Sequence, residues 1–312
     1  MTTVAPVTPP LRGHVLDVEG LDARELMRLC DLAIEMREAR ATRRHRSLLE
    51  AETVALAFFE PSTRTRISFQ LAATALGATT VDLVADASSV RKGESLVDTV
   101  RTLERTGVTI LVLRHAAAGA AHLAARVTGL SVINAGDGAH AHPTQALIDL
   151  FTLREALGRL EGREVAIVGD VVHSRVARSN IHALVAVGAR VRVAGPPAWV
   201  AGFETWEGVD VVSSLDAALV GADAVMALRV QLERDAGTNG PALAEYVRDW
   251  RLDRERLRLA APHAPVLHPG PTNEGVEITA DLANGPRSLI GRQVENGVPV
   301  RMAVLARLAG GR

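Results

Sequence analysis

Near residue 60, a run of hydroxyl and guanidinium side chains follows directly on an apolar stretch. Residues 54–59 are apolar, Glu60 and Pro61 interrupt them, and the next residues open a segment with helical spacing that stops at Gly77. The first turn of a helix presents free backbone N–H groups, to which Ser, Thr and Arg side chains add further donors. A plain helix cap would explain one hydroxyl but not this density of donors. The pattern favours a phosphate-binding turn formed by Ser62, Thr63, Arg64 and Thr65.

Two further sequence features bear on the class of ligand and on the groups that would bind it. The chain contains neither G-x-G-x-x-G nor G-x-x-x-x-G-K-[ST], which disfavours a dinucleotide or a nucleoside triphosphate and leaves a small phosphate compound. Lys92 is the only lysine among 35 basic residues. A lysine could be retained here by chance on a solvated loop. It could also be retained because the position needs a compact, movable ammonium group that arginine cannot replace.

Predicted strands and helices alternate along most of the chain. This alternation is typical of the α/β class with parallel sheets, in which ligands bind outside the carboxyl ends of the strands. The donor-rich segments that follow the strands are therefore the expected site. We predict strands at residues 54–59, 80–84, 108–113, 131–133, 164–169, 190–194, 209–212, 224–228 and 265–267.

The length and this repeated pattern predict two domains, because about 150 residues is typical of one domain and the chain has 312. Each domain is expected to be a parallel sheet flanked by helices. Residues 1–143 with 293–312 form the first domain, and residues 144–292 form the second. A predicted C-terminal helix at residues 293–308 carries an apolar face and returns to the first domain.

Composition excludes several classes of protein. With 35 basic and 36 acidic residues the net charge is -1, which is unlike the broad positive surface of a nucleic-acid or membrane-surface binder. A single cysteine, Cys30, excludes an internal disulfide framework. No stretch reads as a signal peptide or a membrane span. We therefore expect a cytoplasmic protein.

Five motifs resemble the catalytic chain of the aspartate carbamoyltransferases, in the same order and over almost the whole chain. The C-terminal segment Q-V-E-N-G-V-P-V-R-M-A-V-L at residues 293–305 extends the resemblance. The motifs are F-F-E-P-S-T-R-T-R (58–66), S-S-V-R-K-G-E-S (88–95), H-P-T-Q (142–145), R-V-Q (229–231) and H-P-G-P (268–271).

The resemblance implies an enzyme of pyrimidine biosynthesis. In that family the amine of L-aspartate attacks the carbonyl carbon of carbamoyl phosphate, giving N-carbamoyl-L-aspartate and phosphate. Ser62, Thr63, Arg64, Thr65 and Ser88 would bind the phosphate. Arg114 would bridge the phosphate and the carbonyl oxygen, where His142 and Thr65 would stabilise the developing negative charge. Gln145 and the backbone carbonyls of Gly270 and Pro271 would hold the carbamoyl NH2.

The resemblance also assigns the acceptor and the assembly. The aspartate-binding residues would be Lys92, Arg175, Arg229 and Gln231, and the forked guanidinium donors of the two arginines suit the two carboxylates of aspartate. The segment with Ser88 and Lys92 would reach into the site of a neighbouring subunit, which implies a homotrimer. Such a trimer could join regulatory or dihydroorotase chains. The residues expected to take part in catalysis are Arg64, Thr65, Lys92, Arg114 and His142.

Neither a covalent nucleophile nor a cofactor is expected. The chain has no G-x-S-x-G elbow, and Cys30 falls in an amphipathic helix predicted at residues 21–46, away from the strand ends. His140 and His142 are spaced like a metal pair, but no third ligand follows at a diagnostic spacing. Catalysis would rest on positioning and electrostatics.

Two alternatives remain open. An ornithine carbamoyltransferase would share the phosphate half, but it typically has Cys where this chain has Thr144, and Arg229 would repel a cationic acceptor. A homologue that binds carbamoyl phosphate without turnover is the second alternative. It is kept open by Ala141, where relatives often have Gln, and by Glu274, where bacterial relatives often have Arg.

Overall fold

The computed structural model describes residues 13–42, 47–84, 94–230 and 242–309. The chain divides into two compact units, each built from separate stretches of sequence. None of the helices in the described ranges combines the length and apolarity needed to cross a membrane. The first unit comprises residues 1–16, 31–137 and 298–312, and the second comprises residues 17–30 and 138–297.

The first unit contains a parallel sheet of four strands in the order β2-β1-β3-β4. Its two inner strands, β1 and β3, are mainly apolar and buried, as expected of a sheet that is covered on both faces. The strands of the sheet are β1 (Thr53–Phe58), β2 (Thr79–Val84), β3 (Ile110–His115) and β4 (Ser131–Asp137).

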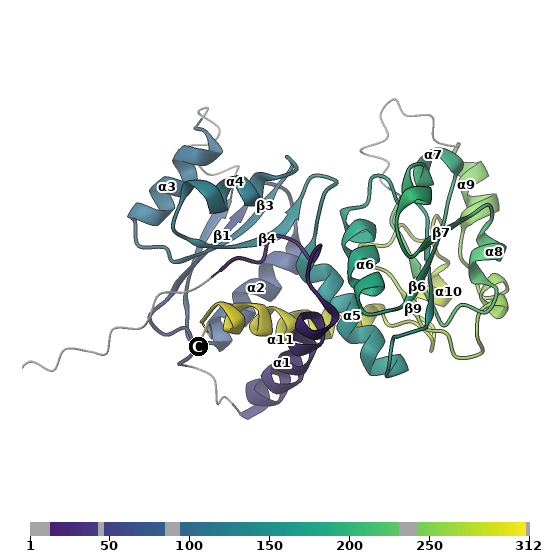
Figure 1. The fold of residues 1–312 in the computed structure, drawn as a ribbon, viewed down its shortest axis with the longest axis horizontal. Helices are drawn as coiled ribbons and strands as arrows, with labels where there is room; N and C mark the ends of the chain where they lie inside the picture. Colours follow the sequence, from purple (N-terminus) through teal and green to yellow (C-terminus); the bar gives the residue numbers. More distant parts are fainter. Residues whose placement is uncertain (1–12, 43–46, 85–93, 231–241, 310–312) are drawn as a thin grey trace, which may run out of the picture. The chain divides into compact units, whose positions relative to one another are not determined.

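Helices cover both faces of this sheet (Figure 1). Ala55 and Ala57 of β1 share one buried cluster with Val100 of α3 and Ala121 of α4. Figure 1 shows α2 and α11 on the other face. The helices are α2 (Thr63–Ala75), α3 (Leu96–Arg105), α4 (Ala120–Val127) and α11 (Ile290–Ala309), of which α11 begins in the second unit.

The second unit contains a parallel sheet of five strands in the order β7-β6-β5-β8-β9. Figure 1 shows α6 and α8 on opposite sides of it. The strands are β5 (Glu164–Val168), β6 (Arg190–Ala194), β7 (Val209–Val212), β8 (Ala224–Ala227) and β9 (Val266–Leu267). The helices that precede, connect or follow them are α5 (Pro143–Leu157), α6 (Arg175–Ala186), α7 (Pro197–Val200), α8 (Leu215–Leu219), α9 (Leu243–Trp250) and α10 (Ala280–Ala283).

The α/β class, with two parallel sheets flanked by helices and a C-terminal helix, is confirmed. The predicted strands fall within a few residues of the observed ones, with β4 extending four residues beyond its predicted end at Ile133. The short helices α7 to α10 were not predicted. The long helix α1 (Ala23–Thr42) was predicted, and its buried Cys30 is the chain's single cysteine. The domain boundaries stay a prediction.

Candidate active site

The expected phosphate-binding groups of the first unit lie at, or just after, the carboxyl ends of two adjacent strands. Phe58 of β1 and Arg114 of β3 are partners in the parallel ladder, so the residues after both strands lie at one edge of the sheet. The segment after β1 leads to β2 on one side of this central pair, and the segment after β3 leads to β4 on the other side. The two connections therefore run in opposite directions. Such a point of reversal is where α/β sheets bind ligands. The sheet order therefore explains why residues 62–65 and Arg114 come together.

The start of α2 differs from the other described helix starts that have serine at the N-cap. Ser62 is the N-cap residue, but its side chain makes no capping hydrogen bond. By contrast, the N-cap serines of α3, α6 and α8 accept one from the backbone N–H three residues on. Thr65 is buried, whereas Thr63 and Arg64 are exposed. The Ser62 hydroxyl thus adds to the polar groups around the start of α2 without serving the helix.

Arg114 is held from two sides within the first unit. Its Nε lies 3.7 Å from Glu60 Oε2, and one of its terminal nitrogens donates a 3.3 Å hydrogen bond to the Ala135 carbonyl. The ladder between β3 and β4 shifts register between Leu113 and His115, where Arg114 lies. Arg114 is half-buried, and these contacts fix a cation beside the start of α2.

The two expected acceptor-binding arginines follow adjacent strands of the second sheet. Arg175 begins α6 after β5, and Arg229 follows β8, the neighbour of β5 in the sheet. The order of strands reverses between β5 and β8, as it does between β1 and β3 in the first unit. Arg175 is only 5% exposed and donates a 3.1 Å hydrogen bond to the Gly138 carbonyl. Arg229 is half-buried.

His142 and Gln145 occupy the start of α5. His142 is the buried N-cap residue, and its backbone N–H donates a 2.9 Å hydrogen bond to Ser179 Oγ on α6. Gln145 lies in the first turn, and its amide donates to Asp149 across 2.8 Å. The segment from His268 to Pro271 follows β9, whose neighbour in the sheet is β8. The structure thus places Arg229 and this segment after adjacent strands.

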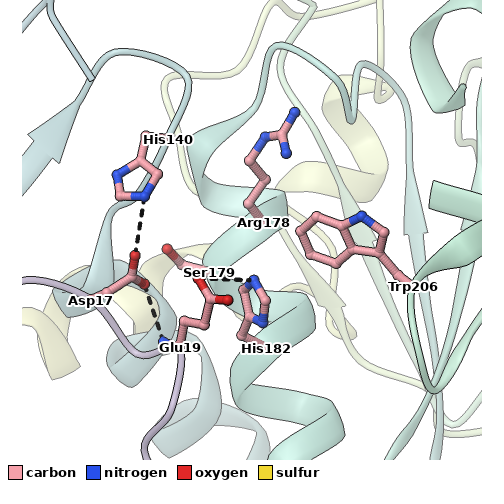
Figure 2. A pocket seen from close by; sticks show the side chains of 7 residues that line it. All are labelled: Asp17, Glu19, His140, Arg178, Ser179, His182 and Trp206. Atoms are coloured by element: carbon pink, nitrogen blue, oxygen red, sulfur yellow. Dashed lines mark hydrogen bonds and ion pairs between the residues drawn. The ribbon is translucent and has the colours of Figure 1, made fainter. Parts of the chain in front are cut away.

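A separate cavity of about 250 Å³ lies within the second unit (Figure 2). His140 Nε2 is 3.4 Å from Asp17 Oδ2 in its wall, and burial lowers the pKa of Arg178, another wall residue. Its link to the predicted site is Ser179, which accepts the His142 N–H. The lining residues are Asp17, Glu19, His140, Arg178, Ser179, His182 and Trp206.

Three predicted site residues fall outside the described ranges: Ser88, Lys92 and Gln231. Of the two departures from the family pattern, Ala141 is buried and Glu274 is exposed. The structure also reveals buried polar residues that sequence reasoning missed. Asp149 contacts Gln145 from one helical turn away, and this spacing of four residues was the available signal. The other missed residues are Asn180, Glu277 and Gln293, which are also buried.

Comparison with known proteins identifies the family. Residues 13–155 match the carbamoyl-P binding domain of the aspartate/ornithine carbamoyltransferases, and residues 161–308 match their Asp/Orn binding domain. The chain belongs to the aspartate/ornithine carbamoyltransferase family. The resemblance seen in the sequence motifs is therefore confirmed. The roles of the individual residues stay predictions.

Curated members of the family are similar over nearly their full length. The chain is 49% identical over 308 residues to the aspartate carbamoyltransferase catalytic subunit of Roseiflexus sp. (strain RS-1), covering 96% of each protein. It is 52% identical over 297 residues to that of Beijerinckia indica subsp. indica, covering 95% of this chain and 94% of the relative.

Solved structures of the family share this fold. Ornithine carbamoyltransferase from Pyrococcus furiosus superposes with a TM-score of 0.87 at 28% identity, covering 96% of this chain and 98% of that chain. Aspartate transcarbamoylase from Trypanosoma cruzi, in complex with carbamoyl phosphate and aspartate, gives a TM-score of 0.84 at 31% identity. The match covers 96% of this chain and 99% of that chain. Both acceptor classes of the family therefore use this fold.

Proposed function

We propose that this chain is an enzyme that transfers the carbamoyl group of carbamoyl phosphate to the amine of L-aspartate, in pyrimidine biosynthesis. The products are N-carbamoyl-L-aspartate and phosphate. The observation that carries the choice of acceptor is the pair of arginines after β5 and β8. Two guanidinium groups suit the two carboxylates of aspartate and oppose the cationic side chain of ornithine. The identities of about 50% to aspartate carbamoyltransferase catalytic subunits support the same acceptor.

The first unit supplies the groups for the phosphate end of the substrate. The first turn of α2, with Ser62, Thr63, Arg64 and Thr65, binds the phosphate oxygens. Arg114, positioned by Glu60 and the Ala135 carbonyl, bridges the phosphate and the carbonyl oxygen. When phosphate leaves, its growing negative charge is stabilised by these cations and N–H groups.

The second unit supplies the groups for the carbamoyl and aspartate ends. Arg175 and Arg229 bind the aspartate carboxylates and so direct the amine towards the carbonyl carbon. The amine nitrogen forms the new C–N bond, and the C–O bond to phosphate breaks, with the electron pair leaving on phosphate. The amine proton passes to the departing phosphate. His142 donates to the carbonyl oxygen of the tetrahedral intermediate, and Gln145, Gly270 and Pro271 accept from the NH2.

We also propose a cytoplasmic homotrimer in which Ser88 and Lys92 complete the site of a neighbouring subunit and Gln231 contributes to aspartate binding. The position of the only lysine in a family motif supports this assembly. Arginine cannot reproduce a compact ammonium group, so a shared site would require retention of lysine at this position.

The first test is an assay of carbamoyl-phosphate-dependent product formation with L-aspartate and L-ornithine in parallel, without added metal. We expect N-carbamoyl-L-aspartate to form and citrulline not to form. Turnover of ornithine would overturn the proposed roles of Arg175 and Arg229. Binding of carbamoyl phosphate without turnover of either acceptor would favour a non-catalytic homologue.

A further inference from the structure

Asp149 is a fully buried carboxylate in the middle of α5. Three side-chain amides donate to it: Gln145 at 2.8 Å and Gln293 at 2.7 Å bond to Oδ1, and Asn180 at 2.8 Å bonds to Oδ2. Several N–H donors that converge on a carboxyl group favour its ionised form. Asp149 is therefore an anion that accepts hydrogen bonds and donates none.

The ionised Asp149 carboxylate fixes the orientation of the Gln145 side-chain amide. Because an ionised carboxylate offers no proton, only the NH2 end of Gln145 can bond to Asp149. The Gln145 carbonyl oxygen, Oε1, must then point away from Asp149. Asp149 thus leaves Gln145 Oε1 available as a hydrogen-bond acceptor. Binding of a carbamoyl NH2 requires such an acceptor.

The same anion connects to the segment after β9 through Gln293. The NH2 of Gln293 is directed to Asp149, so its oxygen accepts the backbone N–H of His268 at 3.0 Å. His268 Nδ1 in turn accepts the backbone N–H of Gly270 at 2.9 Å. A continuous chain of hydrogen bonds therefore runs from Gln145 through buried side chains to Gly270.

A second buried carboxylate, Glu277, fixes the state of His268. Since Nδ1 of His268 accepts a hydrogen bond, it carries no proton, and the neutral ring must hold its proton on Nε2. Nε2 lies 3.1 Å from Glu277 Oε1, which also accepts the Asn273 N–H at 2.6 Å. His268 and Glu277 are each 1% exposed. The Gly270 N–H is therefore directed into the protein, towards His268.

We infer that this chain of buried groups selects the acyl group of the phosphate substrate. Asp149, acting through Gln145, and Glu277, acting through His268, orient the Gln145 oxygen and the carbonyls of Gly270 and Pro271 as acceptors. This set favours a group that carries NH2 and disfavours an isosteric methyl, as in an acetyl group. The inference rests on the proposed function, and Asp149, Glu277, Gln293 and His268 act in it as positioning residues.

The preference for an NH2 over a methyl group follows from the acceptors that a methyl group would leave unpaired. A carbamoyl NH2 satisfies the oriented acceptors, whereas a methyl group leaves them desolvated without a partner. Sites built to hydrogen-bond a substrate group reject analogues that lack it more strongly than apolar pockets reject a size difference. Replacing Asp149 by Asn introduces an NH2 that can donate to Gln145 Oε1. The Gln145 side-chain amide can then flip, so that its oxygen no longer faces the substrate as an acceptor.

The test compares two stable probes that differ only in this group. Phosphonoacetamide carries NH2 on its carbonyl, and phosphonoacetone carries CH3. Dissociation constants are measured by calorimetry on the intact protein, with inorganic phosphate as a reference for the first unit. We expect the wild type to bind the amide about tenfold or more tightly than the ketone. In Asp149→Asn this preference should fall to within about twofold, with phosphate binding unchanged.

Asn180→Ala is the matched control. It removes a donor from the same carboxylate, but from the α6 side, so it disturbs the buried cluster without freeing Gln145. We expect it to keep the wild-type preference. If Asp149→Asn does not fold, Asp149→Ser takes its place, because it also removes the anion that orients the Gln145 amide and its hydroxyl can donate to Gln145 Oε1.

The outcomes separate this inference from the proposed function. Equal binding of the two probes by the wild type would overturn the inference, as would an unchanged preference in Asp149→Asn or in Asp149→Ser used in its place. An equal loss in Asn180→Ala would show a merely structural cluster and also overturn it. Binding needs no turnover, so absent transfer to aspartate together with the expected probe preferences would overturn only the proposed function.

Discussion

Arg66 on α2 and Asp82 on β2 form an ion pair of 3.3 Å. The pair holds one arginine of the first turns of α2 against the neighbouring strand. Arg64, two residues earlier, is exposed. The two residues have the same chemistry and nearly the same position, but only Arg66 is held by this contact. They therefore form a matched pair for separating phosphate binding from structure.

Arg64→Ala should lower kcat/KM for carbamoyl phosphate by about a hundredfold, because it removes a charge-assisted contact to phosphate. The inhibition constant of inorganic phosphate should rise with it. Arg66→Ala should change both values by less than about threefold, since an exposed ion pair contributes little. Initial-rate kinetics on both variants check this, and equal losses would contradict the assignment of Arg64.

His142→Ala should lower kcat more than it weakens binding of carbamoyl phosphate. Its side chain is proposed to act on the oxygen that gains charge in the transition state, where loss of one donor typically costs about 10²-fold to 10³-fold. The backbone hydrogen bond from residue 142 to Ser179 does not need the imidazole, so the variant should fold. Steady-state kinetics and thermal unfolding test both points. A larger change in KM than in kcat would make His142 a binding residue.

Mixed trimers test the proposed sharing of sites. Trimers of Lys92→Ala alone or of Arg64→Ala alone should each lose most of their activity. After dissociation and reassembly together, about a quarter of the sites would combine an intact Arg64 from one subunit with an intact Lys92 from the next. Activity should recover to about that fraction of the wild-type value. Each variant reassembled with itself is the control, and no recovery would argue against shared sites.

Tyr246 should make the protein sensitive to alkali. It is the only tyrosine, it is 1% exposed, and burial raises the pKa of its phenol, with the carboxylates of Glu277 and Asp170 adding to the shift. Up to about pH 10 the phenol is protonated in both states. Above that, the unfolded chain loses the proton and the folded chain keeps it, so stability falls by about 1.4 kcal/mol per pH unit until the folded phenol ionises.

Ultraviolet absorbance of the phenolate measures this directly, because a single tyrosine gives the signal. Chain unfolded in urea should ionise around pH 10, and the native protein should show no phenolate there. Tyr246→Phe should flatten the fall in unfolding free energy above pH 10. A native titration with an ordinary midpoint would contradict the proposed shift.

Local sequence patterns predicted much of the fold because most strands contain several apolar residues and the long helices are amphipathic or capped. They also placed residues 62–65 after a predicted strand, as the structure does. Arg114 was placed just after a strand predicted at residues 108–113, whereas it lies inside β3 near its carboxyl end. Short helices were missed because packing defines them: Tyr246 and Trp250 of α9 are buried in the cluster that covers the second sheet.

The buried network behind Gln145 was missed for a different reason. Gln293 donates to Asp149 from 144 residues away in the sequence, and no local pattern reports such a pairing. A carboxylate in a helix is usually solvated, so Asp149 gave no sign that it was buried. Sequence likewise placed Arg175 near a strand end, but it did not predict that Arg175 is buried or that its side chain donates to the Gly138 carbonyl.

Helix α11 has a consequence for how the protein is made. Its residues up to 297 belong to the second unit, and those from 298 belong to the first. Within the first unit, Arg301 donates a 2.8 Å hydrogen bond to Ser68 and lies over the Phe69 ring, and Leu305 is fully buried. Synthesis proceeds from the N-terminus, so the first unit lacks part of its core until the end of α11 has left the ribosome. The unit that begins the chain is therefore the last to be completed.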